Sequence, residues 1–222
     1  MSYETIVEIS TFIFFILSAV LSFYLTKKYV ARKEKSYLFW SIGMWIFSIA
    51  DFLELIFAFN IYSQLLAKSY LFLVAILTNI LAIGSIELVK SNKIKKIYFL
   101  YSALTIAFLF YITSISSIGN IVVNFVVTGM VPINIIVVSS LITFPAMIVL
   151  IGVSAIGYMR TKRKNLLWII LGVLIVGIGG TLYIAAFPAF LYYVEFIGLV
   201  MLWLGFFDLN IIKKHKTKHL HK

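Results

Sequence analysis

The 222-residue chain contains no cysteine, and this absence removes several kinds of chemistry. Disulfides, thiolate nucleophiles, iron–sulfur clusters and cysteine-ligated zinc are all excluded. Histidine is nearly as scarce, and His215, His219 and His221 all lie in the last eight residues. Haem ligation by two histidines, histidine-rich zinc sites and Ser–His catalysis are therefore excluded from the long apolar part of the chain. We accordingly expect no metal, no cofactor and no enzymatic activity.

Charge is also scarce, because only 12% of the residues are charged and 63% are hydrophobic. The mean hydropathy of +1.08 excludes a soluble globular domain. The formal net charge of +11 does not indicate nucleic acid, because the basic residues lie in short segments between long apolar stretches. Anionic lipid head groups attract such segments. We expect the partners to be the lipid bilayer and anionic lipid head groups, with no nucleic acid.

The basic residues that are present have an informative distribution. Eighteen of the 19 fall in four clusters, at residues 27–35, 90–96, 160–164 and 213–222. Only Lys68 lies elsewhere. By the positive-inside rule, the clusters predict an outside N-terminus and a cytoplasmic C-terminus, in a prokaryotic plasma membrane.

The apolar stretches between the clusters are long enough to cross a bilayer, which takes about 20 residues of helix. Seven are expected, at residues 6–25, 37–59, 69–89, 97–116, 133–158, 165–187 and 189–212. The predicted fold class is thus an all-α integral membrane protein with one domain, 1–212, and a basic tail, 213–222. The opening Met1-Ser-Tyr-Glu-Thr has no basic residue, so we expect the first segment to be retained as a span.

Aromatic residues gather near both ends of these segments, as interfacial anchoring predicts. Tyr98 is expected in the cytoplasmic band and Tyr70 in the outer one. Trp45 lies nearer the middle of its segment and is expected to pack between helices.

The longest outer connection is Ser116–Pro132. It contains Ile121-Val-Val-Asn-Phe-Val-Val between Gly-Asn and Thr-Gly pairs. This run is typical of a small hairpin, but it is equally compatible with an outward extension of the fifth span.

A weak internal similarity suggests a 3+1+3 plan, in which two parallel three-helix units are joined by the fourth span. Leu38-Phe39-Trp40 resembles Leu166-Leu167-Trp168, and Gly84-Ser-Ile-Glu-Leu resembles Gly205-Phe-Phe-Asp-Leu. Chance similarity between apolar helices is the alternative.

Acidic residues inside the spans are the candidate site. Asp51 and Glu54 lie three residues apart on one helix face, and Glu195 lies in the outer part of the seventh span. No basic residue occurs in the predicted spans. Two interpretations stay open: neutral carboxylic acids that bond neighbouring helices, or a hydrated ion or proton site, with Asn79 and nearby tyrosines as available partners. Glu87 and Asp208, near basic loops, are expected to form ion pairs there.

Small residues indicate close helix packing in the sixth span. Gly177, Thr181 and Ala185 follow small-xxx-small spacing. In the fifth span, Pro145 and Gly152 predict a kink or mobile point.

Two segments carry a resemblance to known families. Trp40-Ser-Ile-Gly43 through Phe52-Leu-Glu54, together with Leu81-Ala-Ile-Gly84, resembles uncharacterised prokaryotic seven-helix membrane proteins and the seven-helix sensor regions of histidine kinases. The resemblance implies a sensor-like receptor or an accessory subunit of a membrane complex. Since no kinase domain follows the seventh span, signalling would pass to a membrane protein partner or through a homo-oligomer. The alternative function is a small proton- or cation-coupled transporter.

Overall fold

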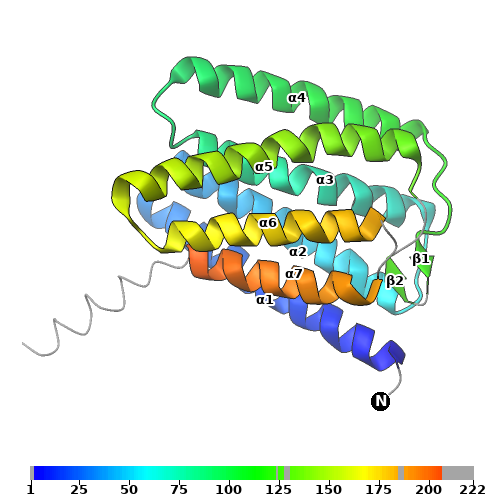
Figure 1. Cartoon of the computed structure of the whole chain (residues 1–222). Coiled ribbons are helices and arrows are strands. Elements are labelled where there is room, and N and C mark those ends of the chain that lie inside the picture. The colour runs from blue at the N-terminus through cyan, green and yellow to red at the C-terminus, as the bar shows by residue number, and fades with distance from the viewer. Residues whose placement is uncertain (1–2, 124, 128–130, 185–187, 207–222) are drawn as a thin grey trace, which may run out of the picture.

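The computed structural model describes residues 3–123, 125–127, 131–184 and 188–206; side chains are described except at residues 3, 176–184, 188–193 and 195. This part of the chain is helical apart from one small hairpin (Figure 1). Its helices are α1 (Tyr3–Arg32), α2 (Lys35–Ala58), α3 (Gln64–Ile86), α4 (Asn92–Ile115), α5 (Ile133–Thr161), α6 (Asn165–Ile184) and α7 (Pro188–Phe206). The predicted all-α class is confirmed.

Five of these helices, α1 to α5, are long and apolar enough to cross a membrane. The described apolar stretches of the last two helices are shorter, at Asn165–Ile175 in α6 and Phe196–Phe206 in α7. The structure is therefore compatible with a multi-pass membrane protein.

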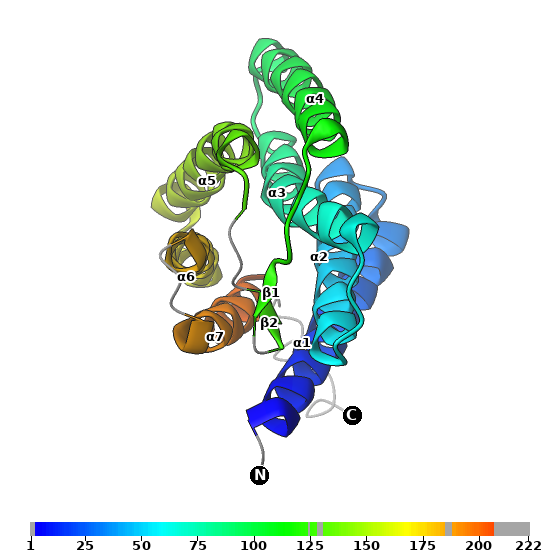
Figure 2. The same ribbon diagram turned by 90° about the vertical axis from the view of Figure 1, so that its right-hand side faces the viewer.

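Six helices follow one another around a ring, in the order α1, α2, α3, α5, α6 and α7 (Figure 2). Helix α4 lies outside this ring against α3 and α5. Its buried residues are Tyr98, Ser102, Leu109 and Thr113, which form a single stripe along the helix. This outer position explains why most of α4 presents apolar side chains outward.

The three described basic clusters lie at one end of the bundle. They occupy the connections α1–α2, α3–α4 and α5–α6, opposite the end that carries the hairpin (Figure 1). The fourth cluster, 213–222, lies outside the described residues, as does the predicted tail. The shared end is the arrangement that the positive-inside pattern requires.

Helix α1 is longer than predicted. The sequence placed its end at Leu25, yet the helix continues to Arg32. Lysine and arginine are good helix formers, so the end of an apolar stretch does not end the helix. The additional two turns carry Lys28 into a buried position, where 9% of its surface is exposed.

Helices α2 and α3 approach closely at two glycines. A Cβ atom at Gly43 would lie 2.7 Å from Cδ2 of Leu81, and one at Gly84 would overlap Cδ1 of Trp40. The Trp40 indole N–H also donates to Ser85 Oγ at 3.3 Å. These positions require glycine because the facing side chain occupies the space that a methyl group needs.

Helices α6 and α7 repeat this contact pattern. A Cβ atom at Gly172 would lie 3.0 Å from Cγ of Leu202, and one at Gly205 would overlap Cγ1 of Ile169. Each helix of the pair thus contributes one glycine that accepts a side chain of the other. The predicted packing residues Gly177 and Thr181 lie in α6, but their side chains and the whole of Ala185 are outside the described residues.

Helix α5 runs unbroken through Pro145. Because proline has no N–H, the carbonyl of Leu141 loses its helical donor. The hydroxyl of Tyr101, from α4, donates to that carbonyl instead. The proline is therefore accommodated by a contact between helices.

Gly152 has open space around it, because a Cβ atom added there would meet no described atom within 4 Å.

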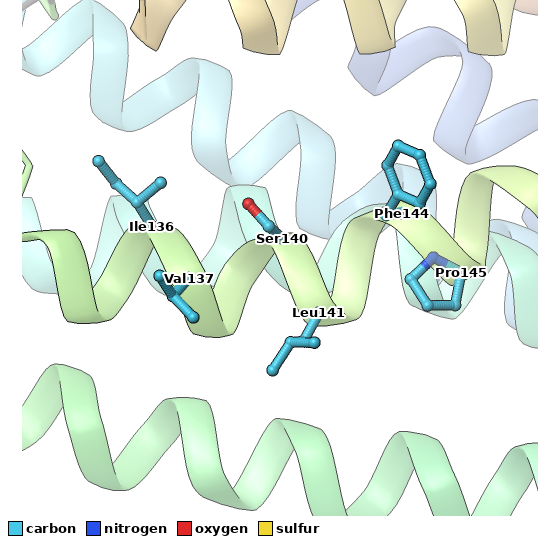
Figure 3. A pocket seen from close by; sticks show the side chains of 6 residues that line it. All are labelled: Ile136, Val137, Ser140, Leu141, Phe144 and Pro145. Atoms are coloured by element: carbon cyan, nitrogen blue, oxygen red, sulfur yellow. The ribbon is translucent and has the colours of Figure 1, made fainter.

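An apolar depression lies along the outer face of α5 beside Pro145 (Figure 3). Its lining residues are Ile136, Val137, Ser140, Leu141, Phe144 and Pro145. Phe144 is 68% exposed, so the depression opens away from the bundle. Such a surface suits lipid acyl chains, because Ser140 is the single polar residue among those that line it.

The connection between α4 and α5 forms the hairpin, one of the two predicted alternatives. Strand β1 (Val122–Val123) pairs antiparallel with β2 (Val126–Val127). Phe125 in the turn has a φ of 66°, and Asn120 accepts the Val122 N–H at 2.9 Å. Val126 and Val127 point to opposite faces of β2, and both are buried: Val126 packs in a cluster with Val7 and Ala58, and Val127 packs in the cluster around Phe57.

Candidate functional site: a buried carboxyl pair

Asp51 and Glu54 lie inside the bundle on successive turns of α2. Only 5% of Asp51 and 6% of Glu54 is exposed. A spacing of three residues puts both carboxyl groups on one helix face, and that face is turned toward α1 and α3. Both side chains therefore lie inside the bundle and not on its outer surface.

Glu54 is held by α3. The Tyr70 hydroxyl donates a hydrogen bond to Glu54 Oε1, and both side chains are buried. The ring of Tyr70 in turn meets that of Phe57 edge-on, with centroids 5.8 Å apart. Tyr70 lies near the hairpin end of α3, where the outer aromatic band was expected, but its ring is buried in the core and does not reach the interface. A tyrosine at the outer end of an apolar helix gives no sequence signal that separates these two positions.

Asp51 is less completely satisfied. The hydroxyl of Ser18, on α1, lies beside its carboxyl group, and Glu54 is its acidic neighbour. Asp51 Oδ2 is buried and has no hydrogen-bond partner among the described residues. Ser18 was not predicted as part of the site, since a serine in an apolar helix usually bonds its own backbone, as Ser18 does to the Phe15 carbonyl at 3.1 Å.

Other hydroxyl groups line α1 on the side that α2 covers. Thr11, Ser18 and Ser22 are each exposed by 1% or less. Thr11 donates to the Val7 carbonyl at 3.0 Å, and Ser22 to the Ser18 carbonyl at 2.7 Å. Small hydroxyl side chains let α1 and α2 approach closely while their polar groups stay bonded.

Apolar clusters flank the carboxyl pair along the bundle axis. Toward the basic end, Met44, Leu21 and Leu81 belong to the largest buried cluster. Toward the hairpin end, a second cluster surrounds Phe57 and includes Ile121 and Val127 of the outer connection. The pair is therefore closed off by apolar side chains at both ends in this structure.

Asn79 does not join the acidic residues. Its Oδ1 accepts from Tyr98 at 2.9 Å and from Ser102 at 3.0 Å, so the amide bonds α3 to α4. Asn79 was an available partner for the carboxyl groups, but its carbonyl oxygen is bonded to α4 instead. Tyr98 was predicted in the cytoplasmic aromatic band, but it is 9% exposed because its hydroxyl reaches this buried amide.

Two other predictions concern ion pairs and packing. Glu87 pairs with Lys95 across the α3–α4 connection, with Oε2 and Nζ 3.0 Å apart. Trp45 packs between α1 and α2, donating to Thr26 Oγ1 at 3.1 Å. Both expectations are confirmed. The side chain of Glu195 in α7 and the whole of Asp208 lie outside the described residues.

The site can hold a proton or a small cation between oxygen atoms, but its described residues offer no thiol or imidazole. Within the described part of the chain, no group of three histidine, aspartate or glutamate side chains could hold a metal ion. Lys28 does not neutralise the acids, because it lies ten residues beyond Ser18 on α1, about 15 Å along the helix axis.

No protein-family model matches the chain, and no curated protein or solved structure shows significant similarity to it.

Proposed function

We propose that the chain is a non-enzymatic seven-helix membrane module that acts as a sensor-like receptor or as an accessory subunit of a membrane complex. The carboxyl pair carries this proposal, because it is buried, lies beside the hydroxyl groups of Tyr70 and Ser18 on neighbouring helices, and is flanked by apolar clusters. A polar contact between helices in an apolar bundle fixes their register, and a signal could act by breaking it. In this function the site links helices and carries no flux.

The proposed orientation places the hairpin outside and the basic connections in the cytoplasm. All seven helices cross the membrane in this arrangement. The positive-inside rule supports it, because the three described basic clusters share one end. Lys68, the remaining basic residue, sits near the hairpin end of α3, where its Nζ donates to the Ser114 carbonyl at 2.7 Å.

The 3+1+3 plan is part of the proposal. Gly172 follows Gly43 by 129 positions and Gly205 follows Gly84 by 121, and the members of each pair make equivalent contacts. By these contacts Trp40 corresponds to Ile169, whereas the similarity in the sequence paired Trp40 with Trp168, one position earlier. The outer position of α4 also suits a linker between two three-helix units.

A second candidate is a small proton- or cation-coupled transporter that uses Asp51, Glu54 and Glu195. The observation that favours it is the buried Asp51 Oδ2 atom, which has no partner among the described residues, since a bound cation or proton would satisfy that oxygen. Transport would require the apolar clusters at both ends to open in turn.

Ion flux in reconstituted vesicles separates the two functions. Purified protein in liposomes is given a proton, sodium or potassium gradient, and the internal concentration is followed with a fluorescent indicator. The module predicts the same flux as protein-free liposomes. Flux that the wild type carries and Asp51→Asn abolishes would establish the transporter and overturn the module.

A further inference from the structure

Lys28 is a buried cation with no carboxylate beside it in the described part of the chain. Its side chain is 9% exposed, and its Nζ atom is inaccessible and has no hydrogen-bond partner among the described residues. Two aromatic faces lie close to it, with Nζ 5.0 Å from the Tyr24 ring centroid and 5.9 Å from that of Tyr37. Aromatic faces attract the ammonium group but bring no net negative charge, so the described surroundings of Lys28 supply no counter-ion.

Arg32 approaches the same tyrosine. Its guanidinium carbon lies 5.4 Å from the Tyr37 ring centroid, and Nη1 donates to the Tyr37 hydroxyl at 3.2 Å. Two cations thus converge on one aromatic ring in the first turn of α2. In the described part of the chain, the one ion pair joins Glu87 to Lys95, so neither Lys28 nor Arg32 is paired with a carboxylate there. Like charges gathered at one corner favour binding of an external anion, and the carboxylate that lies there, the exposed Glu34, makes no ion pair among the described residues.

The local backbone adds hydrogen-bond donors. Helix α2 begins at Lys35, and its N-cap residue Glu34 makes no side-chain hydrogen bond to the first turn. The first N–H groups of a helix without such a cap are free to bind an anion, and the helix dipole favours negative charge there. Lys28, Arg32 and this helix terminus all lie at the α1–α2 corner.

We propose that Lys28 and Arg32 bind the phosphate group of an anionic membrane lipid at the α1–α2 corner. A phosphate suits the arrangement because guanidinium binds it with two N–H groups while ammonium acts as a point charge. We assign this phosphate to a lipid because the corner lies where two apolar helices end and because it carries the first basic cluster. The long lysine stem lets the ammonium move to the head-group level when lipid binds. The inference goes beyond the proposed function and does not depend on it.

Thermal unfolding in detergent tests the proposal. The full chain in non-ionic micelles is titrated with phosphatidylglycerol, with phosphatidylcholine or with inorganic phosphate, and the unfolding temperature is recorded. We expect phosphatidylglycerol to stabilise the wild type in a saturable way. Lys28→Gln and Arg32→Gln should each weaken the apparent affinity about tenfold, or about 1.4 kcal/mol, because each removes a charge-assisted hydrogen bond to the phosphate.

Lys27→Gln is the matched control, because Lys27 is the exposed neighbour of Lys28 in the same cluster. It should keep the wild-type affinity. If Lys27→Gln weakened the apparent affinity for phosphatidylglycerol equally, general surface charge would explain the binding and the proposed site would be overturned. A Lys28-dependent shift with inorganic phosphate or phosphatidylcholine would overturn the anionic lipid as the ligand. If Lys28→Gln fails to fold, the exposed Arg32 variant decides, and an unchanged affinity there overturns the proposal.

Discussion

The hydroxyl group of Tyr70 on α3 donates a hydrogen bond to the carboxyl group of Glu54 on α2, and both side chains are buried. This bond places a polar contact between the two most enclosed of the five long apolar helices. Together with Asp51 and Ser18, it joins α1, α2 and α3 at one level of the bundle.

Tyr70→Phe should lower the free energy of unfolding by about 1–3 kcal/mol, because it leaves the Glu54 oxygen buried without its donor while keeping the aromatic packing. The measurement is unfolding by sodium dodecyl sulfate in mixed micelles. Tyr111→Phe serves as a control on the exposed face of α4, where 59% of the side chain is accessible. If both variants unfold alike, the bond contributes nothing to stability.

Asp51→Asn should change the free energy of unfolding by less than about 0.5 kcal/mol, since the amide keeps the shape and can hydrogen-bond to the neighbouring Ser18 hydroxyl. Asp51→Leu removes the polar group beside Ser18 and should cost about 0.6–2 kcal/mol. Phe52→Leu, at the exposed neighbouring position, controls for a new leucine in α2. An Asn variant as unstable as the Leu variant would show that the ionised carboxylate itself matters.

Tyr101 and Pro145 should be energetically coupled through the Leu141 carbonyl. Tyr101→Phe should cost about 1 kcal/mol in the wild type, because it leaves that carbonyl unsatisfied. In a Pro145→Ala background the helix supplies an N–H, so the same change should cost less than half as much. The double-mutant cycle measures the coupling, and a coupling energy of zero would mean that the Tyr101 hydroxyl does not compensate for the proline.

Gly84→Ala should destabilise the bundle by about 1–3 kcal/mol, because the added methyl group meets the Trp40 ring. Gly152→Ala makes the same chemical change where no described atom lies within 4 Å, and it should be neutral or slightly stabilising. Unfolding of both variants in mixed micelles checks the pair. Equal effects would argue against the close α2–α3 contact.

The sequence was sufficient for much of the fold. Long apolar stretches and basic clusters predicted every helix close to its observed position. Both patterns can be read along the sequence without knowing which helices pack together. Helix ends were less accurate: α1 continues past Leu25 to Arg32, since basic residues extend a helix as readily as they end an apolar segment. The choice between hairpin and helix at residues 121–127 needed the packing of Val126 and Val127.

The candidate site was only half predictable. The acidic pair stood out because charge is rare in apolar helices, and its spacing put it on one face. Its partners did not, since Ser18 and Tyr70 look like ordinary residues of apolar helices. Asn79 is the opposite case. It was an available partner for the acids, but its amide oxygen accepts hydrogen bonds from Tyr98 and Ser102 of α4. Pairing between helices depends on rotation about each axis, and periodicity alone does not fix that rotation.

We propose that seven helices cross the membrane with the basic connections in the cytoplasm, and cysteine labelling tests this orientation. Single cysteines at Ser91, Thr161 and Asn120 are introduced into a chain whose native sequence has none, so the background is clean. Intact cells are treated with a membrane-impermeant thiol reagent, and lysed cells provide the control for reactivity. We predict labelling of the Asn120→Cys variant alone in intact cells. Labelling of Ser91→Cys or Thr161→Cys in intact cells would contradict the account.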